Sequence, residues 1–398
     1  MPWEVKEVVD QRKQLLEQWE QGESIAELGR SFGVSRQTVY KWIERFQEHG
    51  EAGLVDRSRA PERHAQRIEA AIREQVLELR HRHARWGPRK LKAYLAARDP
   101  RTVWPATSTI GDWLRQEGLA HPRRARRRTP AMTEPLSHAA APNQVWCADF
   151  KGWFRTADGR RIDPLTVTDA ASRYLLRCVA VDKSDGPHVR AVMEAAFREF
   201  GLPEAIRTDN GPPFASVAPA GLSRLALWWL RLGIRQERIE PGCPQQNGRH
   251  ERFHLTLKQE TASPPAATRA AQQRTFERFR DIYNRERPHE ALQYRTPQSC
   301  YQASARLFPA RLPELEYPAG VTLRRICQQG SVKWGGLRTY VSEVLARETV
   351  GLLRADDRYW ELYFGPVLIG WLQPSASTFH PAHRPPPDLE WEPGHALL

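Results

Sequence analysis

The sequence predicts a multidomain chain with α-helical units at the N-terminus, an α/β domain in the middle and a small β-barrel near the C-terminus. Three observations support this fold class. Apolar residues repeat at helical spacing through the first part of the chain. From Gln144, β-prone apolar runs alternate with amphipathic helical segments, and short β-prone runs follow one another closely over 318–374. A chain of 398 residues can form about two to four domains, each with its own core.

The charge of the chain is strongly and unevenly basic. Its formal net charge is +13, and the first 130 residues carry +8 of this excess, with 26 Lys and Arg against 18 Asp and Glu. A polyanionic partner is therefore expected rather than an acidic protein surface.

Cysteine usage and hydropathy exclude several classes of protein. The five cysteines are scattered and form no CxxC pair, which argues against a zinc site or a disulfide framework and suits a reducing, cytoplasmic compartment. The N-terminus is charged and no apolar run approaches about 18 residues, so neither a signal peptide nor a membrane span is predicted.

Residues 1–60 are predicted to form a helix-turn-helix domain. Ser24 and Glu27 form a capping box that starts a short second helix, Gly33 makes the turn, and Ser35 caps a third helix. The outer face of that third helix carries polar side chains, which are Arg36, Gln37, Tyr40 and Lys41. Such a face suits contact with DNA bases in the major groove. A plain three-helix bundle is the alternative, and the turn glycine and the basic charge favour DNA binding.

Residues 61–121 are predicted to form a second helix-turn-helix or winged-helix-like DNA-binding domain. Pro88 starts one of its helices and Gly118 ends another. A basic linker over 122–142 follows, and its five closely spaced arginines are Arg123, Arg124, Arg126, Arg127 and Arg128. This segment is either a solvated linker or an arm that lies on DNA phosphates, and its charge density favours the arm.

Residues 143–305 are predicted to form an α/β domain with a mixed five-stranded sheet and helices. Three β-prone runs separated by turns indicate an antiparallel meander: VWCADFKGWF, RIDPLTVTDA and YLLRCVAV. An amphipathic helix, a strand that ends at Asp209, a helix, another strand and a helix from Glu251 follow. This order of strands and helices is typical of an α/β domain.

The C-terminal part is predicted to contain a small SH3-like β-barrel over 306–375. Its strand candidates are short, and glycines such as Gly335 and Gly365 supply the turns between them. The remaining residues, 376–398, are rich in proline and are predicted to be a poorly ordered tail.

Three carboxylates are the candidate catalytic and metal-binding residues. Asp149 lies in the run VWCADF, Asp209 ends AIRTD, and Glu251 opens the helical run ERFHLTLK. Carboxylates on rigid strands and a helix can hold two divalent cations for phosphoryl transfer. Lys258 shares the helical face of Glu251 and can contact phosphate, and Asn247 precedes a glycine that lets the loop approach DNA closely. Each acid alone could be a solvated charge, but the flanking runs and the basic units favour catalysis.

Four segments carry a family resemblance. WCADFKGWF, RTDNGPPF, PQQNGRHERFHLTLK and YNRERPHEALQYRTP, in this order and after a helix-turn-helix region, resemble the DDE insertion-sequence transposases with a retroviral-integrase-type core. The resemblance covers about residues 1–300. It implies an RNase H-like catalytic core that uses Mg²⁺ or Mn²⁺, an acidic triad of Asp149, Asp209 and Glu251, and Lys258 as the lysine after the triad. Four further residues match the downstream family signature, with a structural or DNA-contacting role: Asn284, Arg287, Pro288 and His289.

The predicted function is DNA transposition. The enzyme would bind terminal inverted repeats in double-stranded DNA, cleave the ends and join 3′-hydroxyl groups to target DNA. Two ends must be brought together, so a homo-multimer is expected on DNA, with no membrane partner and with association to the nucleoid in the bacterial cytoplasm. Two alternatives are a DNA-binding regulator with an inactive core and a metal-dependent nuclease without strand transfer.

Other candidate features have simpler interpretations. The interval of forty-one residues between Asp209 and Glu251 is longer than in the related integrases, and its additional residues fall in FASVAPAGLSRLALWW, a predicted loop or helix. His250 and His254 could join a metal site at i and i+4, but with no third histidine nearby a zinc site is not favoured. Trp228 and Trp229 are predicted core residues. The remaining acids are assigned to turns or strand edges, with Asp169 the substitute for Asp149: Asp163, Asp169, Asp182 and Asp185.

Overall fold

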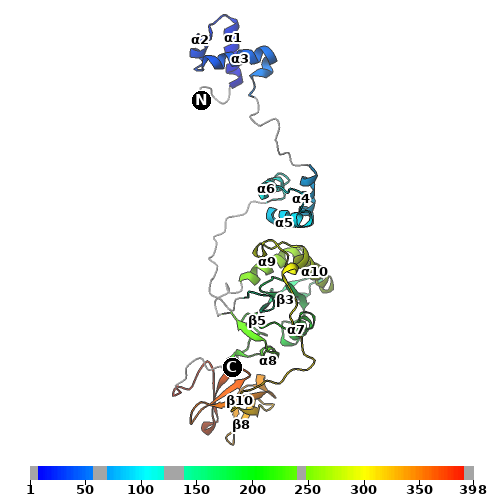
Figure 1. Cartoon of the computed structure of the whole chain (residues 1–398), viewed down its shortest axis with the longest axis vertical. Helices are drawn as coiled ribbons and strands as arrows, with labels where there is room; N and C mark the ends of the chain where they lie inside the picture. The colour runs from blue at the N-terminus through cyan, green and yellow to red at the C-terminus, as the bar shows by residue number, and fades with distance from the viewer. Residues whose placement is uncertain (1–7, 57–69, 121–138, 240–247, 390–398) are drawn as a thin grey trace. The chain divides into compact units, whose positions relative to one another are not determined.

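The computed structural model describes residues 8–56, 70–120, 139–239 and 248–389 (Figure 1). The chain divides into two compact units, 1–70 and 71–398. Within the described ranges, no helix is long and apolar enough to cross a membrane. Some predicted DNA-binding residues lie outside the described residues: Arg123, Arg124, Arg126, Arg127, Arg128 and Asn247.

The first unit has the helices expected of a helix-turn-helix domain. They are α1 Val8–Glu20, α2 Ile25–Ser31, α3 Arg36–His49 and the 3₁₀-helix η1 Gly50–Leu54. The predicted capping box is confirmed, because Ser24 and Glu27 exchange side-chain and backbone hydrogen bonds at the start of α2. Gly33 has φ 62°, a left-handed conformation that glycine adopts without strain. The helices enclose a small core around Leu15, Leu28 and Trp42.

All regular secondary structure in residues 70–120 is helical. The helices are α4 Ala70–Arg82, α5 Pro88–Arg98 and α6 Thr107–Gln116. Pro88 stands at the start of α5, where its missing N–H costs nothing. Trp86 is buried at the centre of this bundle and stacks on the ring of His83 at 3.9 Å.

The α/β part is built on one mixed sheet. Its strands are β1 Val145–Phe150, β2 Phe154–Arg155, β3 Arg161–Asp169, β4 Leu175–Val181, β5 Ala205–Thr208 and β6 Arg235–Arg238. Strand β1 pairs with β3 in the antiparallel and with β5 in the parallel sense; β6 is parallel to β5, and β2 and β4 are antiparallel to β3. The sheet thus has six strands rather than the predicted five. The run VWCADFKGWF forms two strands because Gly152, with φ 87°, interrupts it.

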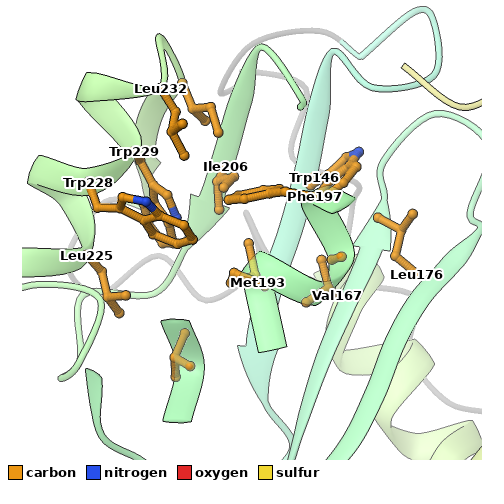
Figure 2. Packing of buried hydrophobic residues seen from close by; sticks show 14 of the residues in the cluster. Trp146, Val167, Leu176, Met193, Phe197, Ile206, Leu225, Trp228, Trp229 and Leu232 are labelled. Carbon is orange, nitrogen blue, oxygen red and sulfur yellow. The ribbon is translucent and has the colours of Figure 1, made fainter. Parts of the chain in front are cut away.

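Helices cover both faces of this sheet. They are α7 Gly186–Phe200, α8 Arg224–Arg231, α9 Gly248–Thr261, α10 Arg269–Asp281 and α11 Pro297–Cys300, with the short turns η2 Pro219–Gly221, η4 Ile282–Glu286 (a π-helical turn) and η5 Glu290–Leu292. One core packs α7 and α8 on the sheet through Trp146, Phe197 and Trp229 (Figure 2). A second core packs α9 and α10 on the opposite face. Trp228 and Trp229 are buried core residues, as predicted.

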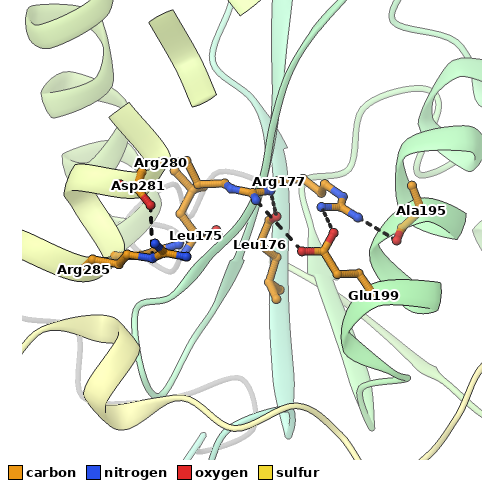
Figure 3. Close-up of polar contacts among 9 residues, drawn as sticks. Leu175, Leu176, Arg177, Ala195, Glu199, Arg280, Asp281 and Arg285 are labelled. Carbon is orange, nitrogen blue, oxygen red and sulfur yellow. Dashed lines mark hydrogen bonds and ion pairs between the residues drawn. The ribbon is translucent and has the colours of Figure 1, made fainter. Parts of the chain in front are cut away.

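Polar contacts join the helices of both faces to strand β4. Arg177 on β4 forms an ion pair of 2.6 Å with Glu199 of α7 and donates to the carbonyl of Ala195 (Figure 3). Arg280 of α10 donates to the carbonyl of Leu176 and lies 4.0 Å from Glu199. Such shared guanidinium contacts hold the edge of the sheet and its flanking helices in a fixed relation.

The C-terminal part is an antiparallel sheet. Its strands are β7 Thr322–Arg325, β8 Ser331–Trp334, β9 Leu337–Tyr340, β10 Thr349–Arg354, β11 Trp360–Phe364, β12 Val367–Gln373 and β13 Thr378–Pro381, with the turns η6 Glu343–Leu345 and η7 Pro374–Ala376. Five of them follow the order β13-β12-β11-β10-β7, and β8 pairs with β9. The predicted strands are present, whereas closure into a barrel stays a prediction. The tail predicted from residue 376 begins too early, because β13 hydrogen-bonds to β12 and extends the sheet.

The long interval before Glu251 links the two sheets. Its additional residues form η2 and α8, and α8 carries apolar side chains on two of its faces. Leu225, Trp228 and Trp229 pack in the core of the α/β sheet. Ala226 and Leu227 pack instead among residues of the C-terminal sheet, together with Leu222 just before the helix. The additional residues are therefore a packing element shared by both sheets.

Candidate functional site

Two of the predicted acids lie at the ends of neighbouring parallel strands. Asp149 lies near the end of β1, and Asp209 directly follows β5. The strands pair with Val145 opposite Ala205 and Cys147 opposite Arg207. Continuing this register by two residues sets Asp149 level with Asp209. Residues at the same level of a sheet point to the same face, so both carboxylates belong to the face covered by α9 and α10.

Asp209 is partly withdrawn from water. Its Oδ1 is buried and has no hydrogen-bond partner in the described part of the chain. Burial raises the pKa of this carboxyl group, and a hydrogen bond from the backbone of Gly211 opposes the rise. A buried carboxylate oxygen without a partner is costly, and a bound cation is one group that would compensate it.

Helix α9 meets the sheet beside Asp149 through two histidines. His250 and His254 each lie with Nε2 2.8 Å from Oγ1 of Thr166 on β3, and Thr166 is paired with Asp149 across the strands. Nδ1 of His254 lies 4.0 Å from Oδ2 of Asp149. Burial lowers the pKa of His250 to about 3 and that of His254 to about 2, so both rings are neutral at pH 7.

The structure also brings together a group of side chains that could bind a metal ion and that the sequence does not predict as a group. Asp149, His250 and His254 have ligand atoms within 4.8 Å of one another, and they are the one such group of three among the described residues. Asp209 and Glu251 lie outside this group. Glu251 is exposed at the start of α9, three residues before His254, while His250, His254 and Leu257 form the buried face of the helix.

The sequence alone does not favour His250 and His254 as metal ligands, because no third histidine lies near them. The third member of the group is Asp149, about one hundred residues earlier, so that pairing depends on the fold. Their i, i+4 spacing was the signal in the sequence. Thr166 and Thr168, which contact these rings, had no sequence signal beyond their place in a β-prone run.

The segment that follows Asp149 along the chain carries basic and aromatic side chains. Burial lowers the pKa of Lys151, and repulsion from Lys258 of α9 lowers it further, so these two ammonium groups share one region. Trp153 is exposed, and the guanidinium groups of Arg161 and Arg155 lie 4.8 and 5.9 Å from its ring centre. Positive charge with an exposed ring is typical of a nucleic-acid-binding surface.

The downstream signature residues support the fold around α9. The side chain of Asn284 is buried and exchanges two hydrogen bonds with the backbone of Leu175 on β4, at 2.8 and 3.0 Å. Arg287 forms an ion pair with Glu260 of α9, and His289 packs against Tyr283. These contacts fix the end of α10 against both the sheet and α9, which is a structural role.

The other candidate acids have structural partners. Asp169 is buried and accepts hydrogen bonds from the backbone of Asn143 and from the backbone and hydroxyl of Ser172, so it is no substitute for Asp149. Asp185 caps the start of α7. Asp163 accepts from Ser184, and Asp182 pairs with Arg269.

The exposed face predicted on α3 is present. Arg36, Gln37, Tyr40 and Lys41 are all exposed, with Tyr40 at 60%. Val39, Trp42 and Ile43 on the opposite side are buried. The helix therefore offers a polar face in the way a recognition helix does.

Comparisons with known proteins agree with this architecture. A helix-turn-helix domain model matches residues 11–62, a homeodomain-like domain model matches 38–114, and two integrase core domain models match 139–244 and 232–297. The chain is 33% identical over 225 residues to the uncharacterized 31.7 kDa protein of insertion element IS407 from Burkholderia multivorans, covering 56% of this chain and 77% of the relative. It is 28% identical over 172 residues to the transposase for insertion sequence element IS904 from Lactococcus lactis, covering 42% of this chain and 65% of the relative.

Among solved structures, the chain is similar to the HTLV-2 integrase catalytic core domain in complex with magnesium. It covers 42% of this chain and 100% of its own, with 15% identity and a TM-score of 0.31.

Helix-turn-helix regions followed by an RNase H-like integrase core with a mixed sheet define the class of DNA-recombining polynucleotidyl transferases. Within that class, the chain belongs to the insertion-element transposases. Its activity is DNA transposition by a transposase of the DDE type.

Proposed function

We propose that Asp149, Asp209 and Glu251 are the acidic triad of this transposase and hold divalent cations, Mg²⁺ or Mn²⁺. The observation that supports this proposal is the parallel pairing of β1 and β5, whose register, continued by two residues beyond the paired Cys147 and Arg207, brings Asp149 level with Asp209. Carboxylates at the ends of paired strands are held by rigid elements, as a shared cation site requires.

The residues present fit such cations. Carboxylate oxygens are the ligands that Mg²⁺ and Mn²⁺ prefer, and the buried Oδ1 of Asp209 accepts no hydrogen bond from the described residues. When bound, the cations would activate the attacking oxygen and stabilise the leaving oxygen of an in-line displacement. Glu251 enters from α9, on the same helix as His254.

The neighbouring lysines would hold the DNA backbone. Lys151 follows Asp149 by two residues, and Lys258 lies on α9 seven residues after Glu251. A phosphate group bound near both side chains would offset the repulsion from Lys258 that helps to lower the pKa of Lys151. A hydroxyl group, first of water and then of a DNA 3′-end, attacks the phosphorus directly, and no residue of the chain becomes covalently attached.

The remaining domains would select and hold DNA. We propose that domains 1–60 and 61–121 bind the terminal inverted repeats, that the linker 122–142 with its arginines follows phosphates, and that Asn247 lets its loop approach the substrate. The core spans 143–305, and the sheet from 306 would close as an SH3-like barrel. A homo-multimer would pair two element ends on the nucleoid DNA.

A strand-transfer assay tests the proposed function. The full chain is incubated with Mg²⁺, a labelled duplex that carries an element end, and a plasmid target. We expect cleavage at the end and joined products. Cleavage without joining would indicate a nuclease, and binding without cleavage would indicate a regulator with an inactive core. Either result would contradict the proposal.

The recognition face of α3 makes a separate prediction. Replacing Arg36 by Ala should weaken binding to the element end by about 1–3 kcal/mol, the range for one good base contact. Binding to a scrambled duplex should change little, and electrophoretic mobility shifts at fixed salt measure both. Lys13→Ala is the matched control, because it removes one positive charge from α1 that pairs with Glu51. An equal loss of sequence specificity in Arg36→Ala and Lys13→Ala would rule out the exposed face of α3 as the surface that contacts DNA bases.

A further inference from the structure

Thr166 determines which nitrogen of each buried histidine carries a proton. Its Oγ1 lies 3.1 Å from the carbonyl oxygen of Asp149 and 2.8 Å from Nε2 of both His250 and His254. A hydroxyl group has one proton to donate and can accept two hydrogen bonds, whereas a carbonyl oxygen can only accept. All three contacts are satisfied in one arrangement. Thr166 donates to Asp149, and both rings donate to Thr166 from Nε2.

This arrangement leaves the other nitrogen of each ring, Nδ1, as an acceptor in a neutral imidazole. Nδ1 of His250 lies 3.3 Å from Oγ1 of Thr168, which can donate to it. Nδ1 of His254 instead faces Oδ2 of Asp149 at 4.0 Å, which is too long for a hydrogen bond. Two acceptor atoms thus face each other. Two metal bonds of about 2.0–2.2 Å place their ligand atoms about 3 Å apart at a right angle and about 4 Å apart when they lie nearly opposite each other, so one cation can bridge these two atoms.

We propose that Nδ1 of His254 is a nitrogen ligand of the cation held by Asp149. This inference rests on the proposed function, in which Asp149 is a metal ligand. His250 is then a positioning residue, because its two nitrogens are engaged by Thr166 and Thr168. The ligand set of this centre is mixed, with oxygen from Asp149 and nitrogen from α9.

A nitrogen ligand changes the metal preference of the centre. Mg²⁺ prefers oxygen ligands, whereas imidazole suits transition metals, whose affinity for nitrogen exceeds that of Mg²⁺. Low exposure of both side chains, 11% for His254 and 18% for Asp149, keeps competing water away from the pair. The centre should therefore select Mn²⁺ over Mg²⁺ more strongly than carboxylates alone would.

Pulsed electron paramagnetic resonance of Mn²⁺ bound to the untagged full chain tests this assignment. The expected result is ¹⁴N modulation from a directly bound ring, replaced by a ¹⁵N pattern when the protein carries ¹⁵N-histidine. His254→Gln should still bind Mn²⁺ through carboxylates, without the nitrogen coupling. The ratio of Mn²⁺ to Mg²⁺ affinity of this variant should fall by about tenfold or more. Mutation of residues that only support a metal ligand already lowers metal affinity by about this factor. His188→Gln, a half-exposed histidine of α7, is the matched control and should retain the coupling.

The outcomes separate the two proposals. Suppose that the wild type binds Mn²⁺ without nitrogen coupling and that Asp149→Asn no longer binds Mn²⁺. This result would overturn the role of His254 and leave the acidic site intact. Coupling that persists in His254→Gln would also overturn it. Equal Mn²⁺ binding by Asp149→Asn and the wild type would overturn the metal site itself. If His254→Gln does not fold, the nitrogen coupling measured in His254→Asn and in the ¹⁵N-histidine-labelled wild type still shows whether His254 binds the cation.

Discussion

Asp149→Asn is expected to lower DNA cleavage and joining by about a thousandfold or more, while DNA binding stays unchanged. A factor of this size corresponds to about 4 kcal/mol of lost transition-state stabilisation, within the several kcal/mol that bound metals supply. The amide keeps the size of the side chain on β1 but lacks the negative charge that holds a cation. Asp209→Asn and Glu251→Gln should have comparable effects. Strand-transfer assays and mobility shifts on the same preparations measure activity and binding.

Asp182→Asn is the control for these variants. Asp182 is a half-exposed acid of the same domain that pairs with Arg269, so its neutralisation should leave activity near the wild-type level. Full activity in any triad variant would remove that residue from the site. Glu251→Gln is the sharpest case, because Glu251 is exposed in the structure and lies outside the group formed by Asp149 and the two histidines.

Patterns among adjacent residues are sufficient to predict most of the helices and strands. The Ser24–Glu27 capping box and Gly33 defined the helix-turn-helix because caps and turns depend on a few adjacent residues. Strands β1 and β5 were predicted with their aspartates because apolar, β-prone runs ended at those residues. The polar face of α3 followed from helical periodicity.

Features that depend on contacts between distant segments could not be predicted in this way. The group of Asp149, His250 and His254 requires α9 to lie over β3, and nothing near His254 in the sequence specifies Thr166 as its partner. The proline-rich composition after residue 375 predicts a poorly ordered tail, yet β13 lies in this segment and pairing with β12 stabilises it. The apolar residues of α8 indicated burial, but not that two different cores share them.

Trp229 of helix α8 tests how much this helix contributes to stability. Trp229→Ala should lower the free energy of unfolding by about 3–5 kcal/mol, the usual cost of truncating a fully buried aromatic residue. Trp229 is 0% exposed and stacks near Phe214, so its removal leaves a cavity between the sheet and α8. Urea unfolding followed by circular dichroism measures the change.

Trp153→Ala provides the matched control, because it removes the same side chain from a position that is 54% exposed. Its cost should stay within about 0.5 kcal/mol, as for surface substitutions in general. Equal losses in the two variants would contradict the packing assigned to α8. Since Ala226 and Leu227 on the same helix pack in the C-terminal sheet, Trp229→Ala should also loosen that sheet. Earlier proteolytic release of a C-terminal fragment in this variant, and not in Trp153→Ala, would show that the interval before Glu251 couples the catalytic sheet to the C-terminal one.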